Sequence, residues 1–161
     1  MKIKIKDITK QLGLSLDYTY QGDFPIREID FEGPISLELK LTHTGREILL
    51  EGTLETSVEL ECSRCLEIFL LPLKLDIFEE FVKREAPPSP GGEGELDEAN
   101  LYYGDYINIR EVIRQNILSN LPMNPLCDPG CRGICPGCGV NLNIEPCSCM
   151  AETGQRRSIN G

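Results

Sequence analysis

The chain of 161 residues has little of what most enzymes use for catalysis. It contains a single histidine, His43, which is therefore the only histidine that could act as the base for a serine or cysteine nucleophile. It also lacks a glycine-rich phosphate loop followed by a helix, and a zinc motif with three ligands and an open fourth position. His43 itself falls in an expected hairpin turn, His43-Thr44-Gly45-Arg46, in which Gly45 is free to take a positive φ. We therefore expect a protein that is not an enzyme.

Long apolar runs and a secretory signal are also missing. No uninterrupted apolar stretch approaches the roughly 18 residues of a membrane span. The N-terminal MKIKIKDITKQLGLS alternates charge with isoleucine and offers no apolar h-region. We expect a cytoplasmic protein with no membrane contact, in a compartment where thiols stay reduced.

Basic residues are scarce relative to acidic ones. Lysine and arginine number 16 against 26 aspartates and glutamates, for a formal net charge of −10. Because binding to nucleic-acid backbones depends on clustered basic side chains, this composition disfavours broad, nonspecific binding. The composition does not exclude a local basic face, since Lys2, Lys4 and Lys6 have the spacing of residues on one side of a strand. Lysines that protect a solvated strand edge explain the same pattern.

Cysteine is what the chain does contain. The eight cysteines are Cys62, Cys65, Cys127, Cys131, Cys135, Cys138, Cys147 and Cys149. At 8 of 161 residues, or about 5%, they fall below the roughly 8 to 10% of a secreted disulfide scaffold. Cys147-Ser-Cys149 would also make a strained local disulfide. Pairs two or three residues apart, separated by a long stretch, are typical of tetrahedral zinc, and we predict that all eight are zinc ligands.

The C-terminal cysteines predict one complete site. Cys135-Pro-Gly-Cys138-Gly139 is a zinc-knuckle signal, because proline and two glycines allow a turn whose backbone amides point at the sulfurs. Cys147 and Cys149, beginning eight residues later, can close the same site locally.

The other four cysteines would form a second site over a long range. Cys62 and Cys65 fall where one expected strand ends and the next begins, at the bend of a hairpin. Cys127 and Cys131 remain to complete this site. A rival grouping joins Cys62 and Cys65 to the CPGC pair in a single ribbon. We favour two closed sites and therefore two zinc ions.

Alternating apolar residues predict a β-rich first part of the chain. The segments are LSLDYTYQ (14–21), ISLELKLTH (35–43), EILLEGTLETSVELE (47–61) and LEIFLLPLKLDIFEEFV (66–82), with a short helical turn in DITKQLGL. A helical period follows in GDYINIREVIRQNILSNLP, whose apolar stripe is Ile109, Val112, Ile113 and Ile117. Asn108 and Glu111 resemble a capping box, and Pro122 stops the helix.

The predicted fold class is α+β, with an antiparallel sheet domain, one packed amphipathic helix and a C-terminal zinc knuckle. The β-rich domain would span residues 1–126, the cysteine-rich segment 127–150 and a flexible tail 151–161. Residues 85–100, EAPPSPGGEGELDEAN, are dense in proline, glycine and acids, and we expect a disordered loop there.

Several motifs in this order resemble one family. They are ECSRCLEIF, the acidic loop, a helix ending in LPMNPLC, and CRGICPGCGVNLN followed by a CxC. The chain is similar to the YceD-like family, whose members are implicated in accumulation of large-subunit ribosomal RNA in bacteria and plastids. Some members resemble the chain at the first CxxC and the LPxxP segment but lack the CPGCG half, which implies separable sites.

The resemblance implies a role in ribosome biogenesis and supplies no catalytic residue. The chain would support the synthesis, processing or stability of large-subunit ribosomal RNA. The implied partner is that RNA or a ribosomal protein, and no small-molecule substrate is expected. Two alternatives stay open. One is a thiol redox sensor or oxidoreductase using Cys62 and Cys65, with Arg64 lowering a thiol pKa. The other is a transcription-associated zinc ribbon.

Overall fold

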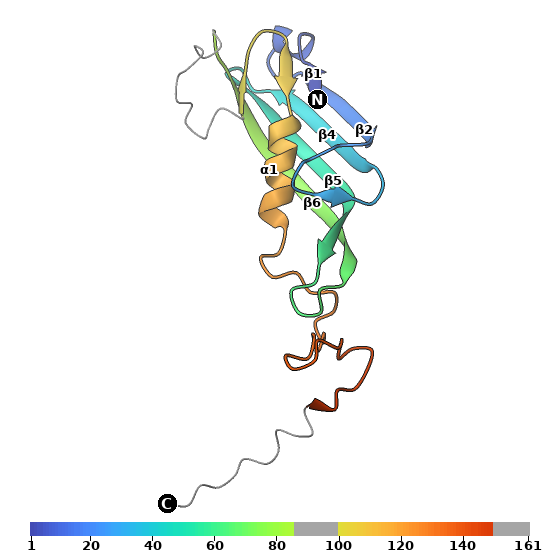
Figure 1. Cartoon of the computed structure of the whole chain (residues 1–161). Coiled ribbons are helices and arrows are strands. Elements are labelled where there is room, and N and C mark those ends of the chain that lie inside the picture. Colours follow the sequence, from blue (N-terminus) through green and yellow to red (C-terminus); the bar gives the residue numbers. More distant parts are fainter. Residues whose placement is uncertain (86–99, 150–161) are drawn as a thin grey trace, which may run out of the picture. The chain divides into compact units, whose positions relative to one another are not determined.

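The computed structural model describes residues 1–85 and 100–149, and the chain in it forms two compact units (Figure 1). Unit 1 comprises Met1–Val58 and Pro72–Leu121, and unit 2 comprises Glu59–Leu71 and Pro122–Gly161. The expected acidic loop lies outside the described residues except at its two ends, Glu85 and Asn100, and the expected tail lies wholly outside them.

Strands dominate the described chain, as the alternating segments predicted. The elements in order are β1 (Lys2–Lys4), the 3-10 helix η1 (Ile8–Lys10), β2 (Ser15–Gly22), β3 (Asp30–Phe31), β4 (Ile35–His43), β5 (Glu47–Glu61), β6 (Ile68–Lys83), β7 (Leu101–Tyr102), β8 (Tyr106–Asn108) and α1 (Arg110–Asn120). The bounds of β4 and β5 coincide with the predicted segments, and η1 falls within the predicted helical turn.

The main sheet has six strands in the order β2-β4-β5-β6-β7, with β3 paired to β5. β4 is antiparallel to both β2 and β5. β7, however, runs parallel to β6, so the sheet is mixed and the prediction of an antiparallel sheet was wrong at this edge. A separate two-stranded sheet pairs β1 with β8.

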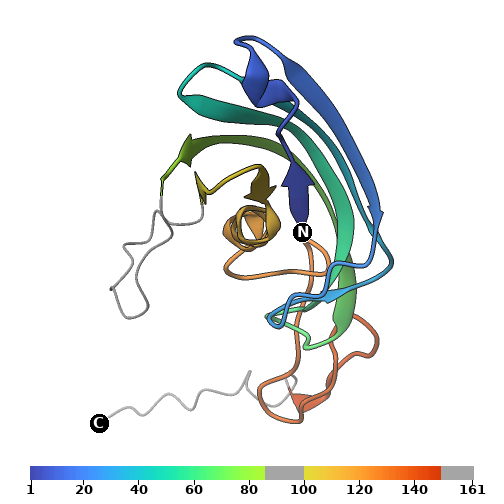
Figure 2. The same cartoon turned by 90° about the horizontal axis from the view of Figure 1, so that it is seen from above.

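The core of unit 1 lies between the sheet and α1. Figure 2 shows α1 on the concave side of the curved sheet. The helix buries Val112, Ile113 and Ile117, the apolar stripe that the sequence predicted. Asn116 Nδ2 also donates to Glu79 Oε1 on β6 over 2.9 Å, which fixes the helix against that strand.

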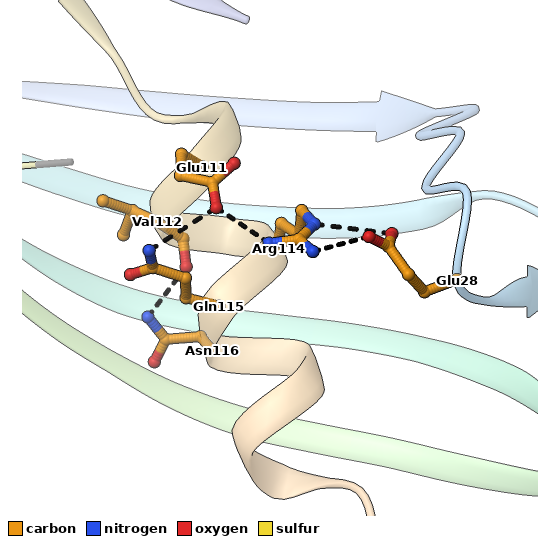
Figure 3. Close-up of polar contacts among 6 residues, drawn as sticks. All are labelled: Glu28, Glu111, Val112, Arg114, Gln115 and Asn116. Carbon is orange, nitrogen blue, oxygen red and sulfur yellow. Dashed lines mark hydrogen bonds and ion pairs between the residues drawn. The ribbon is translucent and has the colours of Figure 1, made fainter. Parts of the chain in front are cut away.

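The start of α1 differs from the predicted capping box. Ile109 is the N-cap, without a side-chain cap hydrogen bond. Asn108 is held in β8, where it pairs with Lys2. Its Oδ1 accepts from the Arg110 backbone N–H over 3.3 Å and from the Met1 amino group over 3.4 Å, not from the N3 backbone N–H that a capping box requires. Glu111 does not reach back to Asn108 and instead accepts from Arg114 over 2.9 Å (Figure 3).

The predicted hairpin turn lies between β4 and β5. Gly45 has a φ of +105°, and the Thr44 N–H donates to the Glu47 carbonyl over 3.0 Å. His43 Nδ1 lies 3.2 Å from the Gln11 carbonyl oxygen. Among the described residues, no helix is both long and apolar enough to cross a membrane.

The N-terminal lysines have the expected period. Lys2, Lys4 and Lys6 are exposed and alternate with buried Ile3 and Ile5. Lys6 lies past the end of β1, with its Nζ 3.7 Å from the Asp105 carboxylate.

Candidate metal centres

The eight cysteine sulfurs gather into two clusters, both in unit 2. Site 1 consists of Cys62, Cys65, Cys127 and Cys131, and site 2 of Cys135, Cys138, Cys147 and Cys149. Within each site the four sulfurs lie within 4.8 Å of one another, and all eight thiols are free. This is the grouping that the spacing favoured, and the single-ribbon alternative is not formed.

The sulfur separations fit a tetrahedral ion. A Zn–S bond of about 2.3 Å places the corners of a tetrahedron about 3.8 Å apart. In site 1, Cys62 Sγ lies 3.8 Å from Cys131 Sγ, and Cys65 Sγ lies 3.6 Å from Cys127 Sγ.

Site 2 is tighter. Cys147 Sγ lies 3.4 Å from Cys138 Sγ and 3.1 Å from Cys135 Sγ. These distances are shorter than the tetrahedral edge and much longer than a disulfide bond of about 2.05 Å. Both sites therefore offer four free thiols in an arrangement that a zinc ion fits.

A tight turn presents the first two sulfurs of site 1. The Cys62 N–H donates to the Glu67 carbonyl over 2.9 Å, and the Leu66 N–H donates to the Cys62 carbonyl over the same distance. Leu66 takes a left-handed φ of +62°, the only such non-glycine among the described residues. The turn closes the hairpin between β5 and β6, as predicted for this CxxC.

The second turn has the same hydrogen-bond pattern. The Cys135 N–H donates to the Val140 carbonyl and the Gly139 N–H to the Cys135 carbonyl, each over 2.8 Å. Gly139 has a left-handed φ of +75°, and Leu66 takes the equivalent place in the first turn with a φ of +62°. Gly137 N–H also donates to Cys135 Sγ over 3.4 Å, which is the amide-to-sulfur contact that the knuckle motif predicted. Two equivalent knuckles are thus present.

Hydrogen bonds and burial within each cluster shift the pKa values of neighbouring thiols in opposite directions. Backbone N–H groups, foremost that of Cys127, lower the pKa of the Cys62 thiol to about 6, whereas the Cys65 thiol and burial raise the pKa of Cys127 to about 12. In site 2 the Cys147 thiol and neighbouring N–H groups lower the pKa of Cys135 to about 7, and the pKa of Cys147 rises to about 12. In each cluster one thiol therefore loses its proton easily, and a neighbouring thiol keeps its proton. Four thiolates in one cluster therefore need a cation.

The interior of unit 2 consists largely of cysteine. Its buried apolar residues among those described are Cys62, Cys65, Cys131, Cys135 and Leu142. Phe69 and Leu126 are only partly buried where they pack against the site 1 sulfurs. So small an apolar interior supplies little hydrophobic stabilisation, and a structural metal commonly supplies the remainder.

Several residues around site 1 have roles that the motif reading missed. The Arg64 guanidinium donates to the Cys131 carbonyl over 2.9 Å, and the Arg64 carbonyl accepts the Ile134 N–H. Gly133 has a φ of +74°, and a Cβ there would lie 2.9 Å from the Arg64 carbonyl oxygen. Asn143 Nδ2 lies 3.3 Å from Cys131 Sγ. These partners are distant in sequence, so spacing alone could not have identified them.

The fold and sites define a β-rich protein that carries two tetracysteine clusters on paired knuckles. Its sequence matches the family model described as large ribosomal RNA subunit accumulation protein YceD over residues 50–158, a range that includes all eight cysteines. The chain belongs to the YceD family.

Several curated proteins are similar to the chain, and two of them carry the same family name. An uncharacterized protein of Mycobacterium tuberculosis is 31% identical over 119 residues, which cover 73% of this chain and 56% of that protein. The large ribosomal RNA subunit accumulation protein YCED homolog 1, chloroplastic, of Zea mays is 27% identical over 148 residues, covering 76% and 50% respectively. Its Arabidopsis thaliana counterpart is 26% identical over 143 residues, covering 74% and 44%. The chain thus spans about half the length of these relatives. No solved structure matches it.

Proposed function

We propose that this chain is a non-enzymatic zinc protein that acts in the cytoplasm to support the synthesis, processing or stability of large-subunit ribosomal RNA. The observation that carries the metal part is the pair of four-thiol clusters in unit 2, whose buried hydrophobic residues, among those described, are four of these cysteines and Leu142. The ribosomal part rests on family membership and on the names of the plant relatives.

The zinc ions have a structural role in this proposal. Each site presents four cysteines, and a closed tetrahedral site leaves no open position for a substrate or activated water. The two ions would hold the knuckles as a rigid surface for a ribosomal RNA or ribosomal protein partner. The family description names accumulation of an RNA and no reaction.

Of the basic residues that the structure describes in unit 2, Arg132 is best placed for a direct RNA contact. Its side chain is exposed, and its backbone N–H is bound to Asn143 Oδ1 over 2.7 Å, so the residue is held in place. Arg64 is a poorer candidate because its guanidinium already binds the Cys131 carbonyl. Phosphate recognition by a positioned arginine has a low ordering cost.

Sedimentation of tagged protein from growing cells tests the proposal. We expect co-migration with precursor large subunits. Arg132→Gln should weaken the association most at low salt and reduce its salt dependence, because one phosphate contact is lost. Lys10→Gln is a matched control, since Lys10 lies on η1 in unit 1 and is paired with Asp7. Absence of the wild-type protein from all ribosomal fractions would contradict the ribosomal role.

A further inference from the structure

Asn143 connects the two sites. It lies in the loop between Cys138 and Cys147, two ligands of site 2, yet its side-chain Nδ2 donates to Cys131 Sγ of site 1 over 3.3 Å. The other Nδ2 hydrogen is used by Asn141 Oδ1 at 2.9 Å. Asn143 Oδ1 accepts the Arg132 N–H at 2.7 Å. Both amide hydrogens and the amide oxygen thus have partners, and one hydrogen is directed at a sulfur of the other site.

The backbone around Asn143 is equally tied to the segment that follows site 1. The Leu142 N–H donates to the Gly133 carbonyl over 2.8 Å, and Asn141 forms an isolated β-bridge with Ile134. Leu142 is also buried, and it is the one buried hydrophobic residue of unit 2, among those described, that is not cysteine. The site 2 loop is therefore held on residues 132–134 by backbone and side-chain hydrogen bonds.

An N–H donor to a metal-bound thiolate stabilises the charge of that ligand, and loss of such a partner typically costs about 10-fold to 100-fold in metal affinity. Cys131 is buried, so water cannot replace the Asn143 amide freely. The loop that carries Asn143 is closed at both ends by site 2 cysteines. Its order therefore depends on whether site 2 is filled.

We infer that Asn143 couples the two sites, so that an ion in site 2 holds the Asn143 amide on Cys131 and thereby raises the zinc affinity of site 1. This inference rests on the proposed metal binding. By thermodynamic reciprocity, an ion in site 1 raises the affinity of site 2 by the same factor. Loading of the two sites is then cooperative.

The test uses the full chain in solutions of buffered free zinc. Occupancy of site 1 is read from protection of the Cys127 thiol against alkylation, followed by peptide mass spectrometry, because Cys127 is the exposed ligand of that site. Asn143→Ala is compared with a variant that disables site 2 by Cys138→Ser and Cys149→Ser, both exposed positions. Asn143→Asp keeps an acceptor for the Arg132 N–H but has no donor for the sulfur.

We expect the free zinc at half-protection of Cys127 to rise about 10-fold to 100-fold in Asn143→Ala and Asn143→Asp. Disabling site 2 should raise it by a similar factor, and adding Asn143→Ala to that variant should change it little further. Ile144→Ala, at an exposed position in the same loop, is the control and should have no effect.

Two outcomes overturn the inference while leaving metal binding intact. One is an unchanged Cys127 half-protection point in the Asn143 or site 2 variants. The other is multiplication of the two effects in the combined variant, which would mean that they are independent. Failure of zinc to protect any cysteine in the wild-type chain would remove the proposed metal function as well.

Discussion

Leu66 occupies in the first knuckle the place that Gly139 occupies in the second. Both take a left-handed backbone conformation, with φ of +62° and +75°. This conformation costs an L-residue roughly 1–2 kcal/mol, which explains glycine in CPGCG. The side chain of Leu66 is 54% exposed, so burial does little to offset the strain. The hydrogen bonds of the turn and the sulfur cluster hold the backbone there.

Replacing Leu66 by glycine should therefore not weaken the protein. Relief of strain is offset in part by the greater entropy that glycine loses on folding, about 0.5–1 kcal/mol. We expect the free energy of unfolding of Leu66→Gly to be unchanged or raised by up to about 1 kcal/mol. Ile68→Gly, in regular β6 and also exposed, should lower it by about 1 kcal/mol. Chemical denaturation measures both, and equal losses would argue against strain at Leu66.

At the scale of single residues, the sequence predicts some features of the two sites and not others. The CPGCG turn was predictable because glycine favours the required backbone, and the structure has that turn. No property of leucine indicates a left-handed φ, so the equivalence of the two knuckles was not predictable. The role of Asn143 was likewise not predictable from the sequence, because its contact with Cys131 joins two loops that only the folded chain brings together.

At the scale of elements, the alternation of apolar residues was sufficient for the long strands. β4 and β5 begin and end where the pattern does, since inward side chains such as Leu37 and Leu54 are fully buried. The capping box failed because β8 extends to Asn108, leaving Ile109 at the N-cap. The parallel pairing of β7 was also unpredictable, because its two residues carry no recognisable strand pattern.

Arg114 of α1 forms an ion pair with a loop that precedes β3. Its Nη2 lies 2.6 Å from Glu28 Oε1, and its Nη1 lies 2.9 Å from Glu111 Oε1 (Figure 3). Hydrogen bonding from Arg114 lowers the pKa of Glu28 below its usual value. A carboxyl with a lowered folded-state pKa stabilises the fold above its unfolded pKa, and this stabilisation is lost as pH falls through the folded value.

Glu28→Gln should therefore lower the melting temperature slightly at pH 7 and have a vanishing effect in acid. The difference from wild type should shrink as pH falls below the usual glutamate pKa of about 4.3, and it should also shrink at high salt because the pair is solvent-accessible. Asp30→Asn, an exposed carboxylate on β3, is the control. A melting-temperature difference that persists at pH 2 would show that the Glu28 carboxylate charge is not its source.

At the scale of the whole molecule, the two units differ in the residues that fill their interiors. Unit 1 buries aliphatic and aromatic side chains such as Ile35, Leu41 and Phe81 between its sheet and helix. Of the five hydrophobic residues buried in the described part of unit 2, four are cysteines. Cysteine spacing favoured the two groups of sulfurs that the structure contains, without excluding a single ribbon. It did not show that residues 59–71 and the chain after Leu121 form a unit separate from the rest of the chain, because that division depends on contacts of residues other than cysteine.

Removal of metal should consequently affect unit 2 selectively. Under reducing conditions, a chelator should abolish hydrogen-exchange protection at the amides of Cys62 and Cys135, which are hydrogen-bonded within the knuckles. Protected amides of β4 and α1 should keep their protection, because their buried core contains no metal ligand. Loss of protection in both units together would show that the metal stabilises the entire chain as one cooperative structure.

The central claim is that the eight cysteines form two zinc sites that share no ligand, rather than redox-active thiols. Its most direct test is the metal content of protein purified without added zinc, together with titration of reactive thiols. We predict about two zinc ions per wild-type chain, few reactive thiols, and loss of at least one ion in both Cys62→Ser and Cys138→Ser. A wild-type protein without metal that readily forms Cys62–Cys65 disulfides would contradict the claim and favour the redox alternative.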